Sequence, residues 1–305
     1  MTNLPAGATP GPLPESVPAP LRLGRSRIYL RRFARNRGAV LGAALFALLV
    51  LYAVAGGLLT VQGWDESDFT ALTQPPSLEH PFGTNQAGND ILAQSVHGLQ
   101  RSLVIATVVS AATITIAAFV GAGAAYLGGR TERVALATIH FLLVVPSFLI
   151  LALVSNRVAG DWVVLIVVLT LFGWMSTARV IWAVSTSLRE RDWVLMAEFM
   201  GVPAWRIVAR HIVPHLGALL VVNLTLGVVS TVLSETSLSF LGFGIKAPDV
   251  SLGSMLAAGA ANITHAPWMF GFPAGLLVLL TVSMTLVGDG LRDALDPTST
   301  AGAHG

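Results

Sequence analysis

The stretch MAEFMGVPAWRIVARHIVP, residues 196–214, is a charged, turn-broken segment in a chain that consists mostly of apolar spans. Apolar side chains recur at helical spacing on both sides of the Gly201–Pro203 turn, and Arg206 and Arg210 lie four positions apart on another face. Glycine allows the positive φ of a tight reversal, and Pro203 suits the first turn of a new helix. The pattern predicts a helix-turn-helix that is amphipathic on both arms.

The composition around this stretch places the chain in a lipid bilayer. Hydrophobic residues make up 54% of the 305 residues and charged residues 11%, whereas a soluble domain carries about 25% charged residues. The net charge of +2 comes from arginines beside apolar spans rather than from a basic face with aromatic residues, which argues against a nucleic-acid partner. Because the chain has no cysteine, a disulfide framework, a thiolate metal site and a cysteine nucleophile are excluded, and we expect no metal site.

Six stretches are long and apolar enough to span a membrane, since a spanning helix needs about 20 residues. They cover residues 38–61, 102–127, 134–156, 162–182, 215–235 and 267–288. The expected fold is therefore an all-α integral membrane bundle of six transmembrane helices. Pro146 and Pro273 fall inside the third and sixth spans and should kink them.

The arginines predict the orientation, because positive charge resists translocation. If the amino terminus is cytoplasmic, 15 of the 18 lysines and arginines face the cytoplasm, and only Arg101, Arg157 and Lys246 face outward. Both termini are therefore expected in the cytoplasm.

The segments between and beyond the spans have distinct expected structures. Residues 1–37 begin with a run rich in proline and glycine and are expected to form a disordered cytoplasmic tail. Residues 62–101 should be an external loop that ends in an interfacial helix, because apolar residues recur at helical spacing from Ile91 to Leu99. The core domain is expected over residues 102–290, with a cytoplasmic loop at 188–214, an external loop packed on the bundle at 236–266 and a cytoplasmic tail at 291–305.

Two interpretations of the 196–214 segment are open from its residues alone. An amphipathic surface that projects into the cytoplasm is suited to docking in a groove on a partner protein. A basic amphipathic segment is also suited to lying on anionic lipid headgroups.

Four stretches resemble one family of transport proteins. Gly201, with Pro214 thirteen positions later, Ala197 before it and RHIVP at the end, is similar to the EAA loop of ABC importer permeases. HPFGTNQAGNDILAQSVHG at 80–98, SETSLSFLGFGIKAPDVSLGSML at 234–256 and LVGDGLRDALDP at 286–297 resemble the dipeptide/oligopeptide/nickel permeases of the second-subunit type. These stretches stand in the family's order over residues 80–297.

The resemblance implies a permease subunit of an ATP-driven importer in the bacterial inner membrane, which moves di- or oligopeptides inward by alternating access. The implied partners are a second, homologous permease, one or two ABC ATPase subunits and an extracytoplasmic substrate-binding protein, besides membrane lipid. The chain has no GxxxxGK[ST] motif, so ATP and Mg would be used by the ATPase subunits, and no catalytic residue or bound cofactor is expected in this chain.

In this family the 188–214 loop is the coupling helix, which fits into a cleft of the ATPase. The residues expected to dock there are Trp193, Met196, Ala197, Glu198, Phe199, Met200, Gly201, Trp205, Arg206, Arg210 and Pro214.

Several positions differ from the family pattern. Leu195 and Met196 stand where the EAA motif has its glutamate and first alanine, and Glu198 stands where arginine is usual. Glu198 either substitutes for the missing carboxylate or is solvated. Asn85 and Asn89 replace a usual aspartate and arginine, and His140 replaces an aspartate.

Polar residues in the fifth span and just after it are candidates for the translocation path or its gate, since polar groups in a membrane are costly and often functional. They are Asn223, Thr225, Glu235 and Ser239. Glu235 is either a gate or a contact for a peptide's amino terminus, or a carboxylate bonded to Ser234, Ser237 or loop amides. Asn223 and Thr225 either line a path or bond across helices. His140 either titrates or donates to a backbone carbonyl.

Other cargoes and functions remain open from the residues. The same type of importer can carry a nickel chelate, glutathione or haem. An ion-coupled secondary transporter would need midplane charges, which the spans lack. An intramembrane hydrolase would need a nucleophile with a partner; His140 and Ser147 have helical spacing, but no GxSxG motif accompanies them.

Overall fold

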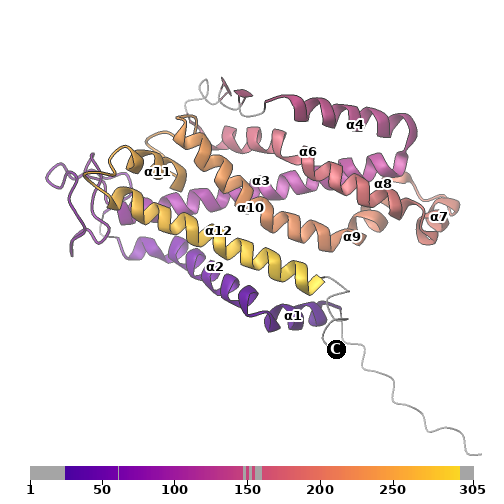
Figure 1. Cartoon of the computed structure of the whole chain (residues 1–305), viewed down its shortest axis with the longest axis horizontal. Coiled ribbons are helices and arrows are strands. Elements are labelled where there is room, and N and C mark those ends of the chain that lie inside the picture. The colour runs from indigo at the N-terminus through magenta and orange to yellow at the C-terminus, as the bar shows by residue number, and fades with distance from the viewer. Residues whose placement is uncertain (1–24, 61, 147–148, 151–152, 155–159, 296–305) are drawn as a thin grey trace, which may run out of the picture.

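The computed structural model describes residues 25–60, 62–146, 149–150, 153–154 and 160–295, and this part of the chain is a bundle of helices without strands (Figure 1). The helices are α1 (Arg25–Arg35), α2 (Arg37–Ala55), α3 (Ile91–Leu127), α4 (Gly129–Val144), α6 (Trp162–Arg189), α7 (Asp192–Phe199), α8 (Ala204–Ile207), α9 (Val213–His215), α10 (Gly217–Phe240), α11 (Leu252–Ala260) and α12 (Trp268–Leu295). A 3-10 turn, η1, covers Gly56–Leu58, and a π-helix, η2, covers Val208–Ile212. The predicted all-α class is confirmed.

Five helical stretches of the described chain are long and apolar enough to cross a membrane. They are Arg37–Leu58, α3, α6, α10 and α12, and they match the first, second, fourth, fifth and sixth predicted spans. Short polar side chains begin three of them: Asn36, Asp90 and Asp161 accept backbone N–H bonds in the first turns of α2, α3 and α6.

The third predicted span differs from its expected bounds. α4 begins at Gly129 and ends at Val144, and Val145 has the extended backbone that proline imposes on the residue before it. Pro146 therefore ends this helix instead of kinking it. The second half of the predicted span lies partly outside the described residues. In α12, by contrast, the helix continues through Pro273.

The helix predicted to lead from the external loop into the second span is present and is continuous with that span. Residues 91–127 form one helix, α3, whose 37 residues extend over about 55 Å, well beyond the hydrocarbon core. Ile91, Leu92 and Leu99 are buried. Because no helix-breaking residue separates the first three turns from the span, α3 continues outward and packs beside α11.

The expected disordered tail is also corrected over its described part. Residues 25–35 form α1, because arginine and apolar residues alternate at helical spacing there. Residues 1–24 and 296–305, the remaining parts of the two expected tails, lie outside the described residues.

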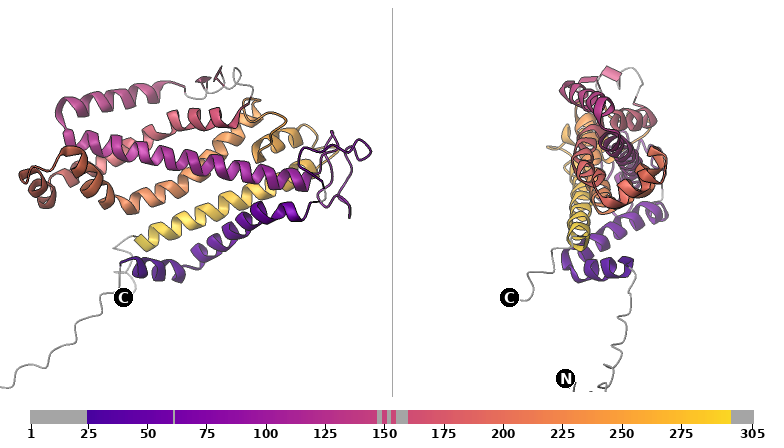
Figure 2. Two further views of the ribbon diagram at one scale, coloured as in Figure 1. Left: turned by 180° about the vertical axis from the view of Figure 1, so that it is seen from behind. Right: turned by 90° about the vertical axis from the view of Figure 1, so that its right-hand side faces the viewer.

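Close helix pairing holds the bundle together. α2 lies along α12, and a Cβ at Gly42 would stand 2.6 Å from the Cβ of Leu286, so only glycine allows this approach. α3 packs against both α6 and α10 and runs the length of the bundle (Figure 2). α4 lies along one edge of the bundle (Figure 1) and buries only Ile139, while Phe141 and Val144 are exposed.

The connecting segments separate to opposite ends of the bundle. α1, the α3–α4 junction and the α7–α8 pair lie at one end, while residues 62–90 and α11 lie at the other (Figure 1). The arginine-rich connections therefore share one end.

Candidate functional sites

The helix-turn-helix predicted from residues 196–214 is present, and its turn has the expected geometry. α7 ends at Phe199, and Gly201, two residues later, has a φ of +74°. The Gly201 N–H donates to the Glu198 carbonyl at 2.9 Å, and the Val202 N–H donates to the Ala197 carbonyl at 3.1 Å. These two bonds are a Schellman motif, the usual helix stop with glycine in the left-handed region. After the turn the chain passes through α8, η2 and α9 into α10.

One face of this segment belongs to the interior of the protein. Val194, Ala197, Ile207 and Ile212 are buried in one cluster with α3, α4 and α6 side chains. Trp193 stacks on His215 with the ring centroids 4.7 Å apart. Trp193 and Ala197, two of the predicted docking residues, thus point inward and hold the segment against the bundle.

The opposite face forms an apolar tip that nothing in the described chain covers. We call Met196, Phe199, Met200 and Trp205 the coupling tip; all four are exposed, Phe199 by 85%. The polar and turn residues predicted to dock with them are also exposed: Glu198, Gly201, Arg206, Arg210 and Pro214. Glu198 makes no ion pair within the described residues. Large exposed apolar side chains grouped in this way mark an interaction surface.

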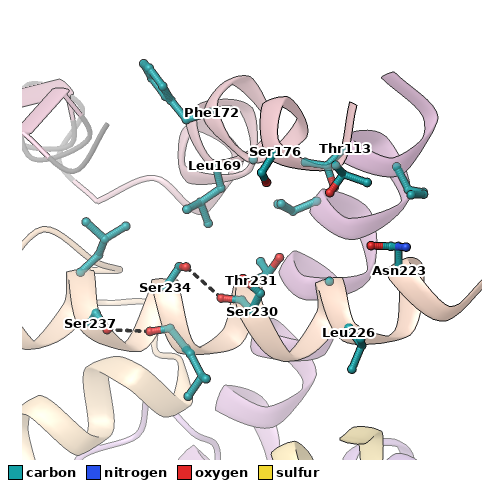
Figure 3. A pocket seen from close by; sticks show the side chains of 17 residues that line it. Thr113, Leu169, Phe172, Ser176, Asn223, Leu226, Ser230, Thr231, Ser234 and Ser237 are labelled. Atoms are coloured by element: carbon teal, nitrogen blue, oxygen red, sulfur yellow. Dashed lines mark hydrogen bonds between the residues drawn. The ribbon is translucent and has the colours of Figure 1, made fainter. Parts of the chain in front are cut away.

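A second site is a groove of about 590 Å³ in the middle of the bundle (Figure 3). α3 contributes Thr113 to it, α6 contributes Ser176 and Thr177, and α10 forms one wall from Asn223 to Leu238. At 1.5 Å per residue this wall is about 22 Å long, which is most of the hydrocarbon thickness. The groove is thus long enough to form part of a path across the membrane.

Only one of the four predicted path residues lines this groove. Asn223 does so, while Thr225 and Ser239 are buried on the other side of α10, and Thr225 donates to the Val221 carbonyl of its own helix at 3.0 Å. The residues that sequence reasoning missed are Thr113, Ser176, Thr177, Ser230, Thr231, Ser234 and Ser237. The sequence did contain a signal for most of the α10 wall. Small or polar residues recur there in alternating steps of four and three, which places them on one helix face: residues 223, 227, 230, 234 and 237.

Glu235 faces away from the groove, toward the start of α11. It is 1% exposed and accepts hydrogen bonds from the Ser239 hydroxyl at 2.8 Å and from the Ser251 hydroxyl at 2.6 Å. Ser251 is the N-cap of α11, so the carboxylate also lies near the positive end of that helix. The bonded-carboxylate alternative agrees with this geometry, although its partners are Ser239 and Ser251.

His140 is exposed on α4 and has no hydrogen bond within the described chain, so the packed-donor interpretation is not supported.

The motif at residues 80–98 forms a hydrogen-bonded lobe at the external-loop end. Buried His80 and Asp90 pair at 2.8 Å, and Asp90 also begins α3. The Asn85 amide donates to the Asn89 side-chain oxygen at 3.1 Å, so two neutral amides pair where the family pattern has two charges. On the same lobe, hydrogen bonds from the Thr70 hydroxyl and N–H lower the pKa of the Asp68 carboxyl.

A second charged cluster joins the lobe to α3 and the loop before α11. Asp249 contacts His97 and Arg101, each at 2.8 Å, and Trp64 stacks on His97. The polar residues at this end thus make contacts that connect separate segments.

The long apolar helices, the groove and the exposed coupling tip together define a multi-pass membrane transport subunit. Residues 114–300 match the family described as binding-protein-dependent transport system inner membrane component, and residues 25–76 match the N-terminal TM domain of oligopeptide transport permease C. The chain belongs to this family of inner membrane transport components.

Three similar proteins are each called oligopeptide transport system permease protein OppC. The protein of Mycobacterium tuberculosis (strain ATCC 25618 / H37Rv) is 46% identical over 279 residues, which cover 90% of this chain and 95% of the relative. The protein of Bacillus subtilis (strain 168) is 31% identical over 266 residues, 87% of each chain. The protein of Escherichia coli (strain K12) is 32% identical over 269 residues, 88% of this chain and 89% of the relative.

Proposed function

We propose that this chain is the permease subunit of an ATP-driven importer that moves oligopeptides inward across the cytoplasmic membrane. The main observation in support of this proposal is that the coupling tip is exposed, while the other face of the same segment packs against the bundle. Such a segment transmits movement between an attached protein and the spans. The names of the relatives support oligopeptides as the cargo.

The proposed orientation places the coupling tip and both termini in the cytoplasm. The arginine-rich connections share the end of the bundle that carries α7 and α8, and the positive-inside rule favours that end as cytoplasmic. The lobe of residues 62–90 then faces the substrate-binding protein.

The energy would come from one or two ABC ATPase subunits that bind ATP and Mg and dock on the coupling tip. Apolar side chains buried at the centre of an interface usually carry most of its binding energy, so Phe199, Met200 and Trp205 are the proposed anchors. Arg206 and Arg210 are placed to meet acidic groups at the rim. Alternating access would open the groove, together with a second permease, first outward and then inward.

The competing functions have weaker support. The groove side chains are all uncharged, which removes the midplane charge that an ion-coupled transporter uses. For the hydrolase alternative, His140 is exposed on α4, and Ser147 lies outside the described residues.

Co-purification of the assembled complex tests the proposal. The chain is expressed with candidate ATPase, permease and binding-protein partners, and Gly201→Asp is compared with Gly242→Asp. Both glycines have positive φ, and a Cβ added at either position would meet no atom within 4 Å, so the backbone cost is matched while only Gly201 lies beside the coupling tip. We expect the ATPase to be retained by wild type and by Gly242→Asp and lost from Gly201→Asp. Equal retention in both variants would contradict docking at this tip.

A further inference from the structure

The groove carries no charged side chain among its lining residues, so hydrogen-bonding groups determine its preference for a substrate. Seven of the lining residues are serines or threonines and one is an asparagine. Hydroxyl groups can both donate and accept, and the direction in which each one donates its proton decides what it offers to the groove.

Three of these hydroxyls donate their protons to their own helix. Ser234 Oγ lies 2.8 Å from the Ser230 carbonyl oxygen, and Ser237 Oγ lies 2.8 Å from the Leu233 carbonyl oxygen (Figure 3). On α3, Thr113 Oγ1 lies 3.0 Å from the Ser110 carbonyl oxygen. Because a carbonyl oxygen can only accept, each hydroxyl must be the donor, and only its lone pairs remain for the groove.

Asn223 also offers the groove more acceptor than donor capacity. Its side-chain N–H donates to the Leu219 carbonyl at 2.8 Å, which leaves the amide oxygen and one N–H free. The side-chain hydroxyls of Ser176, Thr177, Ser230 and Thr231 make no hydrogen bond within the described chain, so they remain able to donate or accept. The groove therefore presents more acceptors than donors.

We propose that this groove favours substrate groups that donate hydrogen bonds, so that ammonium and guanidinium groups pass more readily than carboxylates. The proposal rests on the proposed function as a peptide permease. A peptide ammonium brings three donors, and Ser234, Ser237 and Thr113 each offer an acceptor along the groove. A carboxylate brings only acceptors and meets no lysine or arginine in the groove lining, so its lost hydration is poorly replaced. The permease thus adds its own charge preference to that of the binding protein.

Thiol labelling tests this preference without any transport. The chain has no cysteine, so Ser234→Cys places one thiol in its groove, and the cysteine-free chain in the same complex gives the background. The rates of reaction with trimethylammonium-ethyl and sulfonatoethyl methanethiosulfonate are compared with those of free mercaptoethanol. We expect the cation-to-anion rate ratio at position 234 to exceed the free-thiol ratio by roughly fivefold, the factor that corresponds to about 1 kcal/mol.

Removing the other acceptors should remove the bias. In the Ser234→Cys chain, adding Thr113→Ala and Ser237→Ala is expected to return the ratio toward that of the free thiol. Thr285→Ala is the matched control, because the Thr285 hydroxyl also donates to its own helix, at 2.8 Å, but lies outside the groove on α12. A ratio at position 234 equal to that of the free thiol would overturn the proposal. So would failure of both reagents to react, because a helix of the second permease would then fill the groove.

Transport supplies the second readout. Proteoliposomes with the complete transporter take up tripeptides that differ only in a central lysine, glutamine or glutamate, with binding-protein affinities measured separately. The maximal uptake rate should fall from lysine to glutamate, and Ser234→Ala with Ser237→Ala should reduce that difference. An unchanged difference in a double variant that still transports would contradict the proposal. If labelling shows the cation bias but no peptide enters with ATP, the proposed function fails while the preference of the groove stands.

Discussion

Ser234 and Glu235 are neighbours in the sequence but point in different directions from α10. Ser234 lines the groove, whereas Glu235 is buried against the N-terminus of α11. A helix advances 100° per residue, so one step is enough to change the surroundings of a side chain completely. Residue type alone left a gate and a hydrogen-bonded carboxylate open for Glu235, and the geometry gives it the contacts of a structural group.

Glu235→Ala should therefore destabilise the protein instead of specifically blocking transport. The substitution leaves the hydroxyls of Ser239 and Ser251 without their acceptor and opens a cavity, and we expect a loss of about 2–4 kcal/mol in the free energy of unfolding. Glu235→Gln keeps the shape and one acceptor oxygen and should cost less. Thermal unfolding of the purified complex, together with ATP-driven uptake, measures both effects. A Glu235→Gln protein of normal stability that transports nothing would show that the charge itself acts in transport.

At the scale of the helices, one face of α1 is expected to contact the membrane. Phe33 lies on the side toward Gly290 of α12, and Leu30 is 69% exposed beside exposed Arg31. Asn36, at the junction with α2, donates to Asp293 of α12 at 3.0 Å and fixes the position of α1. A basic amphipathic helix held next to a span is suited to lying among headgroups, with its apolar residues toward the acyl chains.

Site-directed labelling in nanodiscs checks this placement. A polarity-sensitive fluorophore on Leu30→Cys should emit at shorter wavelength than the same label on Arg31→Cys, and anionic lipid should increase the difference. Arg31→Cys is the matched control, because it differs by one position on the same exposed helix. Identical spectra at the two positions would place α1 in water.

The sequence was a good guide to elements where apolar runs were long and ended in clear signals. The spans that became α2, α6, α10 and α12 were predictable for this reason, and so was the Gly201 turn. α1 was missed because the proline-rich residues before it dominated the expectation for the whole tail. The first turns of α3 were predicted as helix, but their burial was not, because it depends on contacts with α11, which are distant in sequence.

The candidate sites were predictable to different degrees. Residues of the coupling tip were found from one amphipathic stretch, but the inward direction of Trp193 depends on its stacking with His215. The groove was predicted only through Asn223, since its shape depends on how α3, α6 and α10 pack. The π-helix at Val208–Ile212 has no marker in composition, and it lies between the coupling tip and α10, a type of irregularity that is common at functional sites.

In the whole molecule, the coupling tip and the groove are joined by one short stretch of chain. From Trp205 the backbone runs through α8, η2 and α9 into α10, whose residues line the groove. Movement of the tip therefore has a covalent and mostly helical route to the groove wall. That route is useful for import only if the tip is cytoplasmic and the lobe of residues 62–90 is outside.

Labelling in intact cells tests this orientation. Ser77→Cys lies on the exposed surface of the lobe, and Glu198→Cys lies beside the coupling tip. The two variants therefore place single thiols at opposite ends of the bundle. A membrane-impermeant maleimide should label Ser77→Cys in whole cells and Glu198→Cys only after the cells are opened, because the arginine-rich end resists translocation. Lysed cells provide the control that both thiols are reactive. Labelling of Glu198→Cys from outside would reverse the topology, and the coupling tip would then be separated from any cytoplasmic source of ATP.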